Sequence, residues 1–361
     1  MKPTILQFQD LENLHGTVSP DGSQPKLVIQ VPCYNEAGTL GIALQALPRR
    51  LPHVCSVEWL IIDDGSSDGT SEVARQYGVD HIVRLPQNRG LANAFRTGLR
   101  ASLQVGADII LNTDADNQYC ADDIPKLLQP ILRGEADIVI GARPISHVEH
   151  FSFAKKCLQR VGSWVVRVAS GTRIEDAPSG FRAMTREAAL RLHVFSRYTY
   201  TLETIIQAGQ NGMRIASVPI RVNPDLRPSR LVKGTTRYVW RSMQTIVRIF
   251  ALYRPFRFFA HVGSVPVSVG ALLCIRWVLL NIFEYPYSGR THVPSLIVAA
   301  VLLLVGFQIW VLGFVADLLA ANRRTLDEIV FSVRRREFAP QFDDAPAAGE
   351  DLRAKGRGAN L

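Results

Sequence analysis

The sequence predicts an α/β fold with a mostly parallel sheet, followed by interfacial helices and a hairpin of two transmembrane helices. The first observation is that apolar, strand-like segments alternate with helical segments about every 25 residues, as in βαβ units. The second is that polar residues follow three of those strands, at the point where each strand ends. The third is that residues 258–283 and 293–316 are long and apolar enough to cross about 30 Å of hydrocarbon.

The individual elements follow from the hydrophobic pattern. Short apolar runs rich in Val and Ile predict strands, and apolar residues at helical spacing between them predict helices. The expected strands are residues 27–31, 57–62, 81–84, 109–112, 136–140 and 214–222. The first expected helix follows Glu36 and ends at about residue 50, the second begins near Thr70, and the third follows Gly90 and ends at about residue 103. Two more are expected over 124–132 and 200–209.

The polar clusters at the strand ends are Tyr34-Asn35-Glu36, Asp63-Asp64 and Asp114-Ala115-Asp116. Right-handed crossovers bring the carboxyl ends of parallel strands to the same edge of a sheet, where open α/β sheets bind ligands. We therefore expect the three clusters to lie close together. Simple packing of Tyr34, and a turn or helix cap at Asp68, remain alternatives for these loops.

Asp114 and Asp116 form the most informative cluster. On an extended backbone, residues two positions apart project to the same side, so the two carboxylates converge. Two carboxylates held together repel unless a cation lies between them, and Mg²⁺ or Mn²⁺ prefers oxygen ligands. A loop in which the aspartates only cap a helix is the alternative, and the convergence of the other two clusters disfavours it.

The ordered set of motifs resembles glycosyltransferase family 2, with its GT-A nucleotide-sugar fold. The matching segments are Pro32-x-Tyr-Asn-Glu36, Asp63-Asp-Gly-Ser-x-Asp-Gly-Thr70, Asn88-x-Gly90 and Asp114-x-Asp116-x-Gln118. The segment Asp176-Ala-Pro-Ser-Gly-Phe-Arg182 is similar to one in the polyprenyl-phosphate glycosyltransferases, among them the dolichyl-phosphate mannose synthases. The resemblance covers about residues 27–335.

The resemblance implies a donor site and a metal site. Asp114, Asp116 and Gln118 would hold Mg²⁺ or Mn²⁺ against the diphosphate of a UDP- or GDP-linked sugar. The nucleotide-sugar donor would further contact a set of residues at the first two strand ends: Pro32, Tyr34, Glu36 and Asp64.

The resemblance also implies an acceptor site for a polyprenyl phosphate. Arg143, with Arg160 and Ser163 as weaker candidates, would bind the acceptor phosphate, and Asp176 would join Asp116 as a catalytic residue that orients the reaction. A weak diphosphate clamp would come from Arg227, Arg230 and Lys233. Arg230 stands where many relatives have Lys, which makes the clamp less secure.

Charge distribution predicts the membrane topology. Net charge is +9, and Arg residues gather beside the apolar segments, which favours an anionic lipid surface; the basic, aromatic-interleaved modules of RNA binding are absent, so no nucleic acid is expected. The loop 284–292 carries Arg290 as its only Lys or Arg, whereas both outer flanks of the hairpin carry Arg clusters. The positive-inside rule therefore places the catalytic domain and both termini on the cytoplasmic face of the inner (plasma) membrane.

These observations divide the chain into five parts. They are an irregular lead-in (1–25), the GT-A domain (26–226), amphipathic juxtamembrane helices (227–257), the transmembrane hairpin (258–320) and a cytoplasmic tail (321–361) that is disordered from about 339. A homo-oligomer is left open by the sequence.

The leading hypothesis is a metal-dependent, inverting transfer of sugar to polyprenyl phosphate. A transferase that extends a saccharide or glycolipid is the alternative within the enzymes; the Gln-x-x-Arg-Trp sequence usual in its processive members is absent here. A membrane protein that binds nucleotide sugars without turnover is the alternative outside them, and the intact Asp114-x-Asp116 argues against it.

Overall fold

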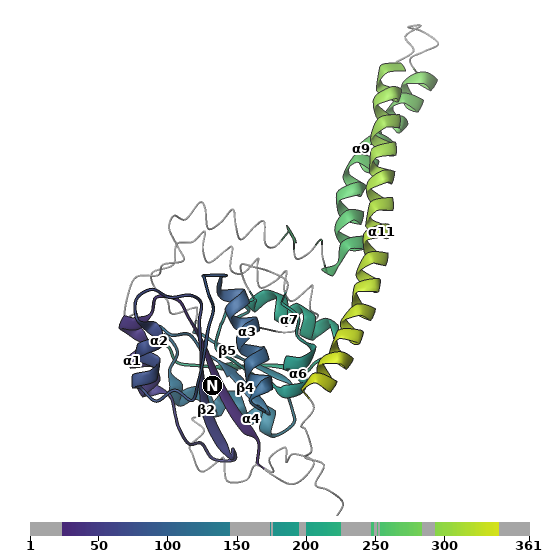
Figure 1. Cartoon of the computed structure of the whole chain (residues 1–361). Coiled ribbons are helices and arrows are strands. Elements are labelled where there is room, and N and C mark those ends of the chain that lie inside the picture. Colours follow the sequence, from purple (N-terminus) through teal and green to yellow (C-terminus); the bar gives the residue numbers. More distant parts are fainter. Residues whose placement is uncertain are drawn as a thin grey trace, which may run out of the picture.

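A computed structural model describes most of the α/β domain and both long helices of the hairpin. The described residues are 24–144, 174, 176–194, 200–224, 247–248, 251, 253–283 and 293–338. The lead-in expected over 1–25 lies almost wholly outside them, as do most of the juxtamembrane helices expected over 227–257 and the tail from 339. Figure 1 shows the α/β domain with the two long helices beside it.

One mixed sheet forms the centre of the domain. Its strands are β1 (Lys26–Cys33), β2 (Ser56–Asp63), β3 (His81–Arg84), β4 (Ile109–Asn112), β5 (Ile138–Ala142), β6 (Arg182–Thr185) and β7 (Ile215–Pro219). Their order across the sheet is β3-β2-β1-β4-β6-β5-β7. All neighbours pair in parallel except β6, which is antiparallel to both β4 and β5. The expected α/β fold is confirmed, whereas the sequence analysis did not anticipate β6.

Helices cover both faces of the sheet. They are α1 (Ala37–Ala46), α2 (Thr70–Gln76), α3 (Leu91–Gln104), α4 (Ile124–Leu132), α6 (Arg186–Arg191) and α7 (Thr201–Gln210), with a short 3₁₀ turn at Ala121–Asp123. Along β1, Val28 packs into the core under α3, whereas Leu27 and Ile29 pack into the core on the opposite face. Burial on both faces explains why the strands read as continuous apolar runs rather than as alternating ones.

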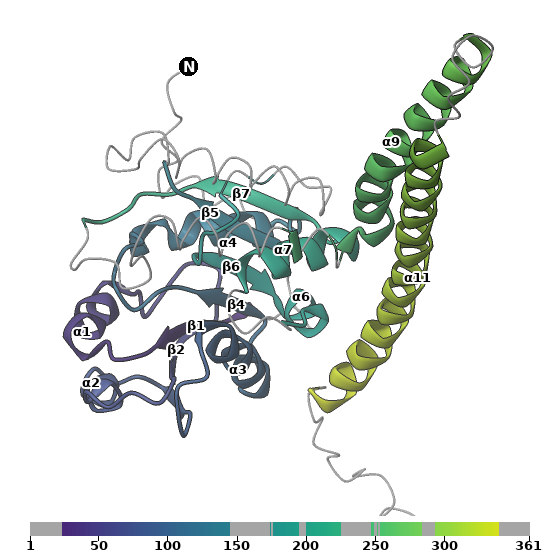
Figure 2. The same ribbon diagram turned by 90° about the horizontal axis from the view of Figure 1, so that it is seen from above.

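The two long helices are α9 (Pro255–Phe283) and α11 (Val293–Glu337). Both are long and apolar enough to cross a membrane, judged by length and composition. They lie side by side outside the α/β domain in both views (Figure 2). Their contact is close: a Cβ added to Gly263 of α9 would come within 2.6 Å of the Trp310 ring on α11.

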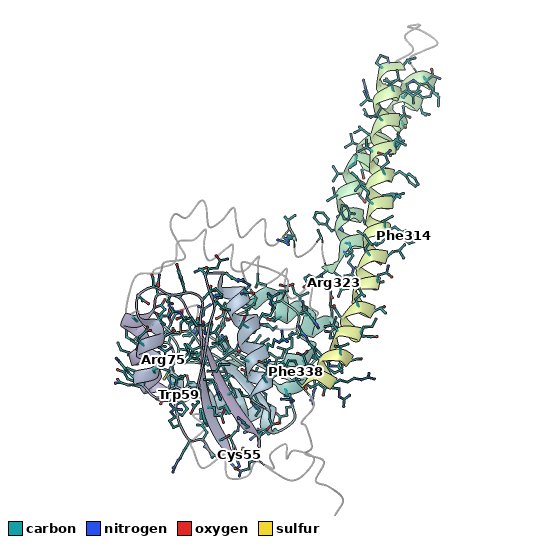
Figure 3. All side chains as sticks on the ribbon, viewed as in Figure 1. Cys55, Trp59, Arg75, Phe314, Arg323 and Phe338 are labelled. Atoms are coloured by element: carbon teal, nitrogen blue, oxygen red, sulfur yellow. The ribbon has the colours of Figure 1, made fainter. Side chains whose placement is uncertain are left out.

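α11 extends well beyond the expected span of 293–316. It continues without a break from Asp317 to Glu337, a segment that we call the stalk. At about 1.5 Å per residue, the stalk is roughly 30 Å long, comparable to the hydrocarbon core itself. Figure 3 labels Arg323 and Phe338 along this part of the chain and Phe314 above it.

The lower end of the stalk packs on the α/β domain. The Arg191 guanidinium of α6 lies 4.2 Å from the centre of the Phe331 ring, and Arg334 donates to the carbonyl of Leu192 at 3.0 Å. Phe338 joins the hydrophobic core beneath α3 and α6. The stalk is therefore a structural part of the domain, which the division of the sequence at residue 320 did not show.

The upper end of the stalk meets a buried polar junction. Tyr253, just before α9, donates from its hydroxyl to Glu203 of α7 at 3.3 Å and lies 3.4 Å from the amide nitrogen of Gln207. The guanidinium of Arg323 lies 5.3 Å from the centre of the Tyr253 ring. Helix α7 is thus joined to both helices of the hairpin.

We predict that Gly98→Ala destabilises the domain and that Gly38→Ala does not. A Cβ at Gly98 of α3 would lie 2.5 Å from Gln30 Oε1 and 2.8 Å from Ile62 Cδ1, both on the sheet beneath the helix. Overpacking of this kind costs about 1–3 kcal/mol. Gly38, in α1, has nothing within 4 Å of the added Cβ, so alanine there should stabilise the helix by about 0.5–1 kcal/mol.

Unfolding midpoints of the detergent-purified full chain measure both effects. A Gly98→Ala midpoint equal to or above that of the wild type would show that α3 can move away from the sheet without loss.

Candidate active site

The carboxyl ends of β2, β1 and β4 lie next to one another, because these strands are neighbours in the sheet. Cys33 is opposite Asp63 in the β1–β2 pairing, and Gln30 is opposite Asn112 in the β1–β4 pairing. The amide of Thr113 still donates to the carbonyl of Gln30, at 3.1 Å. The expected convergence of the three polar clusters on one edge is confirmed.

Asp114 and Asp116 lie in the turn that follows β4. Burial and the nearby charge of Asp116 raise the pKa of Asp114 to about 6, although the charge of Arg143 and the hydroxyl of Tyr119 act in the opposite direction. Asp116 Oδ1 accepts a hydrogen bond from the backbone amide of Gln118 at 3.1 Å, which closes the turn. Two carboxylates in one turn, with an amide side chain two positions after the second, offer the oxygen ligands that Mg²⁺ and Mn²⁺ prefer.

The described residues contain no cluster of three or more His, Cys, Asp or Glu side chains that could hold a metal ion. The aspartate pair and Gln118 therefore provide at most part of a coordination shell. Mg²⁺ is commonly bound by one or two carboxylates together with substrate phosphates. The donor set on this edge fits such a shared site and does not fit a structural metal held by protein alone.

A buried amide holds the end of β4 in place. Asn112 accepts from Gln30 Nε2 at 2.9 Å, and its own nitrogen donates to the carbonyl of Gly180 at 2.8 Å and to Tyr200 Oη at 3.0 Å. This one side chain connects β1, the segment before β6 and the start of α7. The sequence analysis gave Asn112 no role, yet an Asn inside an apolar strand is a signal, because a buried amide must be hydrogen-bonded.

Gly180 and Tyr119 fix the segment before β6 against Asp114. The amide of Gly180 donates to Tyr119 Oη at 3.0 Å, and the Tyr119 ring stacks on Phe181 with 5.0 Å between centroids. A Cβ at Gly180 would lie 3.0 Å from Asp114 Oδ1 and 3.1 Å from Tyr200 Oη. A larger residue would press on the Asp114 carboxylate and the Tyr200 hydroxyl unless these side chains moved by a few tenths of an ångström.

Arg182, which follows in β6, is buried. It donates to Thr204 Oγ1 at 2.7 Å and to the carbonyl of Thr201 at 3.3 Å, both in α7, and also to the carbonyl of Ser179. Its guanidinium lies 5.4 Å from the centre of the Tyr200 ring. The arginine of this motif thus anchors α7 to the sheet.

Arg143 and Asp176 form a bidentate ion pair. Arg143 Nε donates to Asp176 Oδ2 at 2.7 Å and its terminal nitrogen to Oδ1 at 3.1 Å, while the backbone amide of Arg143 also reaches Oδ2, at 3.2 Å. Asp176 is fully buried, and about a quarter of the Arg143 side chain is exposed. Burial lowers the pKa of Arg143, but the hydrogen bonds and charge of Asp176 outweigh it, so the pKa lies above its ordinary value.

Two of the residues expected on the acceptor side, Arg143 and Asp176, are in direct contact. The charge of Arg143 also acts on Asp114, where it lowers the pKa of the carboxyl group. The remaining candidates lie outside the described residues: Arg160, Ser163, Arg227, Arg230 and Lys233.

On the donor side, the loop after β1 is exposed at Tyr34 and tied down around it. Tyr34 is 44% exposed, which disfavours the alternative of simple packing. Glu36 accepts from Thr39 Oγ1 at 2.7 Å, and its amide donates to Thr70 Oγ1 at 3.0 Å. Pro32 is buried in β1.

Asp64 organises the neighbouring loop. Its two carboxylate oxygens accept from the backbone amides of Arg89 and Gly90, each at 2.8 Å, and only 3% of the residue is exposed. Gly65 has a positive φ of 74°, and a Cβ there would meet the backbone of Gln87 at 2.6 Å. These hydrogen bonds show that Asp64 holds the loop after β2 against the loop after β3. The contact of Asp64 with the donor stays a prediction.

Comparisons with known proteins match this architecture. The family model for glycosyl transferase family 2 matches residues 28–191. An undecaprenyl-phosphate mannosyltransferase of Micrococcus luteus is 28% identical over 215 residues, covering 56% of this chain and 86% of its own. A UDP-N-acetylglucosamine–dolichyl-phosphate N-acetylglucosaminyltransferase of Methanococcus voltae is 30% identical over 187 residues, covering 45% and 73%.

Among solved structures, glucosyl-3-phosphoglycerate synthase from Mycobacterium tuberculosis is similar with a TM-score of 0.49 and 20% identity, over 63% of this chain and 79% of that one. Membership of a family is shown instead by the matched family model, by the relatives of which this chain covers more than two thirds, and by the aspartates at the end of β4. The chain belongs to glycosyltransferase family 2 and is a glycosyltransferase with a mostly parallel GT-A sheet.

Proposed function

We propose that this enzyme transfers a sugar from a nucleoside diphosphate to a polyprenyl phosphate, with inversion and with Mg²⁺ or Mn²⁺. The observation that carries the proposal is that the charge of Arg143, paired with Asp176, acts on the carboxylate of Asp114, in a chain that also has two long apolar helices. The choice of acceptor is supported by the names of the relatives from Micrococcus luteus and Methanococcus voltae, which contain undecaprenyl-phosphate and dolichyl-phosphate.

On the donor side, the bond that breaks joins the anomeric carbon to the diphosphate. A divalent cation bound with Asp114, Asp116 and Gln118 would neutralise the charge that accumulates on this leaving group. The exposed Tyr34 and the carboxylate of Glu36 would contact the nucleoside, on a loop held by Thr70. Arg227, Arg230 and Lys233 are further proposed contacts of the diphosphate.

On the acceptor side, the new bond joins a phosphate oxygen to the anomeric carbon. A phosphate monoester is already anionic near pH 7, so it needs orientation more than it needs a base. A guanidinium can bind a phosphate through two parallel hydrogen bonds, and Asp176 fixes the plane of the Arg143 guanidinium. We assign Asp176 to positioning Arg143 rather than to proton abstraction, with Arg160 and Ser163 as additional proposed contacts.

An assay of the full chain in lipid nanodiscs tests the proposal. Nucleotide sugars labelled in the sugar are supplied with a short polyprenyl phosphate, and organic extraction recovers the lipid product. We expect transfer to the lipid phosphate. Transfer only to a saccharide or glycolipid would support the extending transferase instead, and donor binding without any transfer would support a protein that binds nucleotide sugars without turnover.

Asp116→Asn should lower turnover by about a hundredfold or more, because the loss of one charge weakens stabilisation of the leaving group. EDTA should have a similar effect that added Mg²⁺ or Mn²⁺ reverses. Asp122→Asn is the matched control, since Asp122 lies in the next turn of the chain and is 81% exposed at its side chain. Full activity of Asp116→Asn, or of the wild type in EDTA, would contradict the metal assignment.

Arg143→Ala should raise the KM for polyprenyl phosphate about 10- to 100-fold, the effect of losing charge-assisted hydrogen bonds worth about 1.5–3 kcal/mol. The KM for the donor should change little. Arg214→Ala removes a comparable bidentate pair, with Asp137, on the exposed surface and should change neither constant.

Asp176→Asn should also raise the KM for polyprenyl phosphate, by less than Arg143→Ala does. A rise in the donor constant alone, with either variant, would place Arg143 on the nucleotide side of the site.

The charge distribution predicts that Ser288 lies outside the cell and that Ser332 and the catalytic domain lie inside. Each Arg moved to the bilayer centre costs about 2.5–3.5 kcal/mol, so the flanks with Arg clusters should stay cytoplasmic. A Cys placed at Ser288 should react with a membrane-impermeant maleimide in intact cells, and one placed at Ser332 should react only after lysis. Labelling of position 332 but not 288 in intact cells would reverse the topology.

A further inference from the structure

The stalk of α11 has one apolar flank that nothing in the described chain covers. Leu319, Leu326, Ile329 and Val333 are 63%, 61%, 56% and 58% exposed. Val330 beside them is 38% exposed. These positions follow the spacing i, i+3, i+4 and i+7, so they form one continuous stripe along the helix.

The other sides of the stalk are accounted for. Arg323, Phe331 and Arg334 face the α/β domain, where they contact Tyr253, Arg191 and Leu192. The opposite flank carries exposed polar and small residues: Asp317, Ala321, Thr325, Glu328, Ser332 and Arg335. The apolar stripe is therefore a separate face, distinct both from the domain contact and from a solvated polar surface.

Lipid does not explain the exposure of this stripe. The expected span ends at residue 316. From Asp317 to Arg336 the sequence carries eight charged residues: Asp317, Arg323, Arg324, Asp327, Glu328, Arg334, Arg335 and Arg336. Phe331, between Ile329 and Val333, packs on α6 of the α/β domain. Leu326, Ile329 and Val333 thus lie at the level of the water-exposed domain, where a row of large apolar side chains requires a cover.

The stripe has the spacing of a parallel coiled coil. Leu319, Leu326 and Val333 are seven residues apart, and Asn322 and Ile329 follow three residues after the first two, which gives the a and d positions of a heptad. The same frame continues into the apolar span at exposed positions, all of them apolar except Gln308: Val298, Val301, Val305, Gln308, Leu312 and Val315. α9 packs on a different line of α11, at Ala299, Gly306 and Gly313. One seam therefore runs from the span into the stalk, away from α9.

We propose that this flank pairs with the same flank of a second copy of the chain, so that the enzyme is a parallel homodimer joined along α11. Copies of one sequence insert in one topology, so the two helices are necessarily parallel. The e and g positions that flank the seam are Leu318, Arg323, Thr325, Val330, Ser332 and Glu337, and their pairs across the seam bring no like charges together. Arg336 takes the last d position of the frame, at the exposed end of the helix. Two further d positions are polar, Gln308 and Asn322, and a polar residue in a coiled-coil seam restricts its register.

The geometry leaves room for two catalytic domains. The stalk contacts its own α/β domain through the side that carries Phe331 and Arg334. The preceding part of α11 contacts α9 along the line of Gly306, and neither contact uses the apolar flank. A two-fold axis along the seam would place the two domains on opposite sides of the helix pair. Figures 1 and 3 show the lower part of α11 passing beside the domain, with no other helix drawn on the side that faces away from the domain.

Disulfide trapping of the full chain tests the pairing. In native membranes or nanodiscs, Leu326→Cys should give a dimer band on mild oxidation, because seam residues of a parallel pair face their own counterparts. Glu328→Cys is the matched control: it is two residues away, exposed and on the polar flank. The wild type reports the background from the five native cysteines. Equal crosslinking at 326 and 328, or trapping of a different protein only, would overturn the proposal.

A mass measurement gives a second, independent readout. Ile329→Asp places a charge in the seam and should reduce the particle in detergent to the mass of one chain, as measured by light scattering. Ala321→Asp places the same charge on the polar flank and should leave the mass at two chains. Because both residues are exposed, neither variant should shift the unfolding midpoint of the α/β domain. A wild type with the mass of one chain, or an Ile329→Asp protein still at two, would contradict the dimer.

Discussion

Two carboxylates at the end of a buried strand are the constraint on which the rest of this site depends. Desolvation and mutual repulsion raise the pKa of Asp114 to about 6, so the pair is costly to hold charged. The positive charge of Arg143 and the hydroxyl of Tyr119 offset part of that cost. Gly180 leaves the carboxylate the space it occupies. The antiparallel β6, inserted beside β4, brings Gly180 to the pair, and β5 on the other side of β6 leads to Arg143.

The same support reaches the membrane helices through α7. Asn112 bonds Tyr200 at the start of α7, and Arg182 bonds the first turn of that helix. Further along α7, Glu203 and Gln207 meet Tyr253, immediately before α9. One helix therefore contacts both the strand end that carries Asp114 and the chain that enters the hairpin. For the proposed lipid-phosphate acceptor, this connection would fix the position of the site relative to the long helices.

The sequence predicted those features that depend on local pattern and chain order. Strands buried on both faces read as apolar runs, and parallel connections place Asp64 and Asp114 on one edge. β6 was missed because its four residues include a buried arginine, which no hydrophobic pattern marks as strand. The positioning roles of Asn112 and Tyr119 were missed because they depend on partners more than 60 residues away in the chain. The pairing of Arg143 with Asp176 could not be read from sequence for the same reason.

The stalk was missed for a different physical reason, which also explains its apolar flank. In hydrocarbon, a helix can be apolar on every side, so the seam of α11 is invisible in the composition of residues 293–316. In water, a helix retains only those apolar residues that are covered, and charged residues take the other positions. Between Asp317 and Glu337 the charges therefore divide the circumference into a face for the domain, a solvated face and the stripe of Leu326, Ile329 and Val333. The stripe continues the heptad frame of residues 293–316, which is the pattern expected if the proposed partner helix runs beside α11 through both segments.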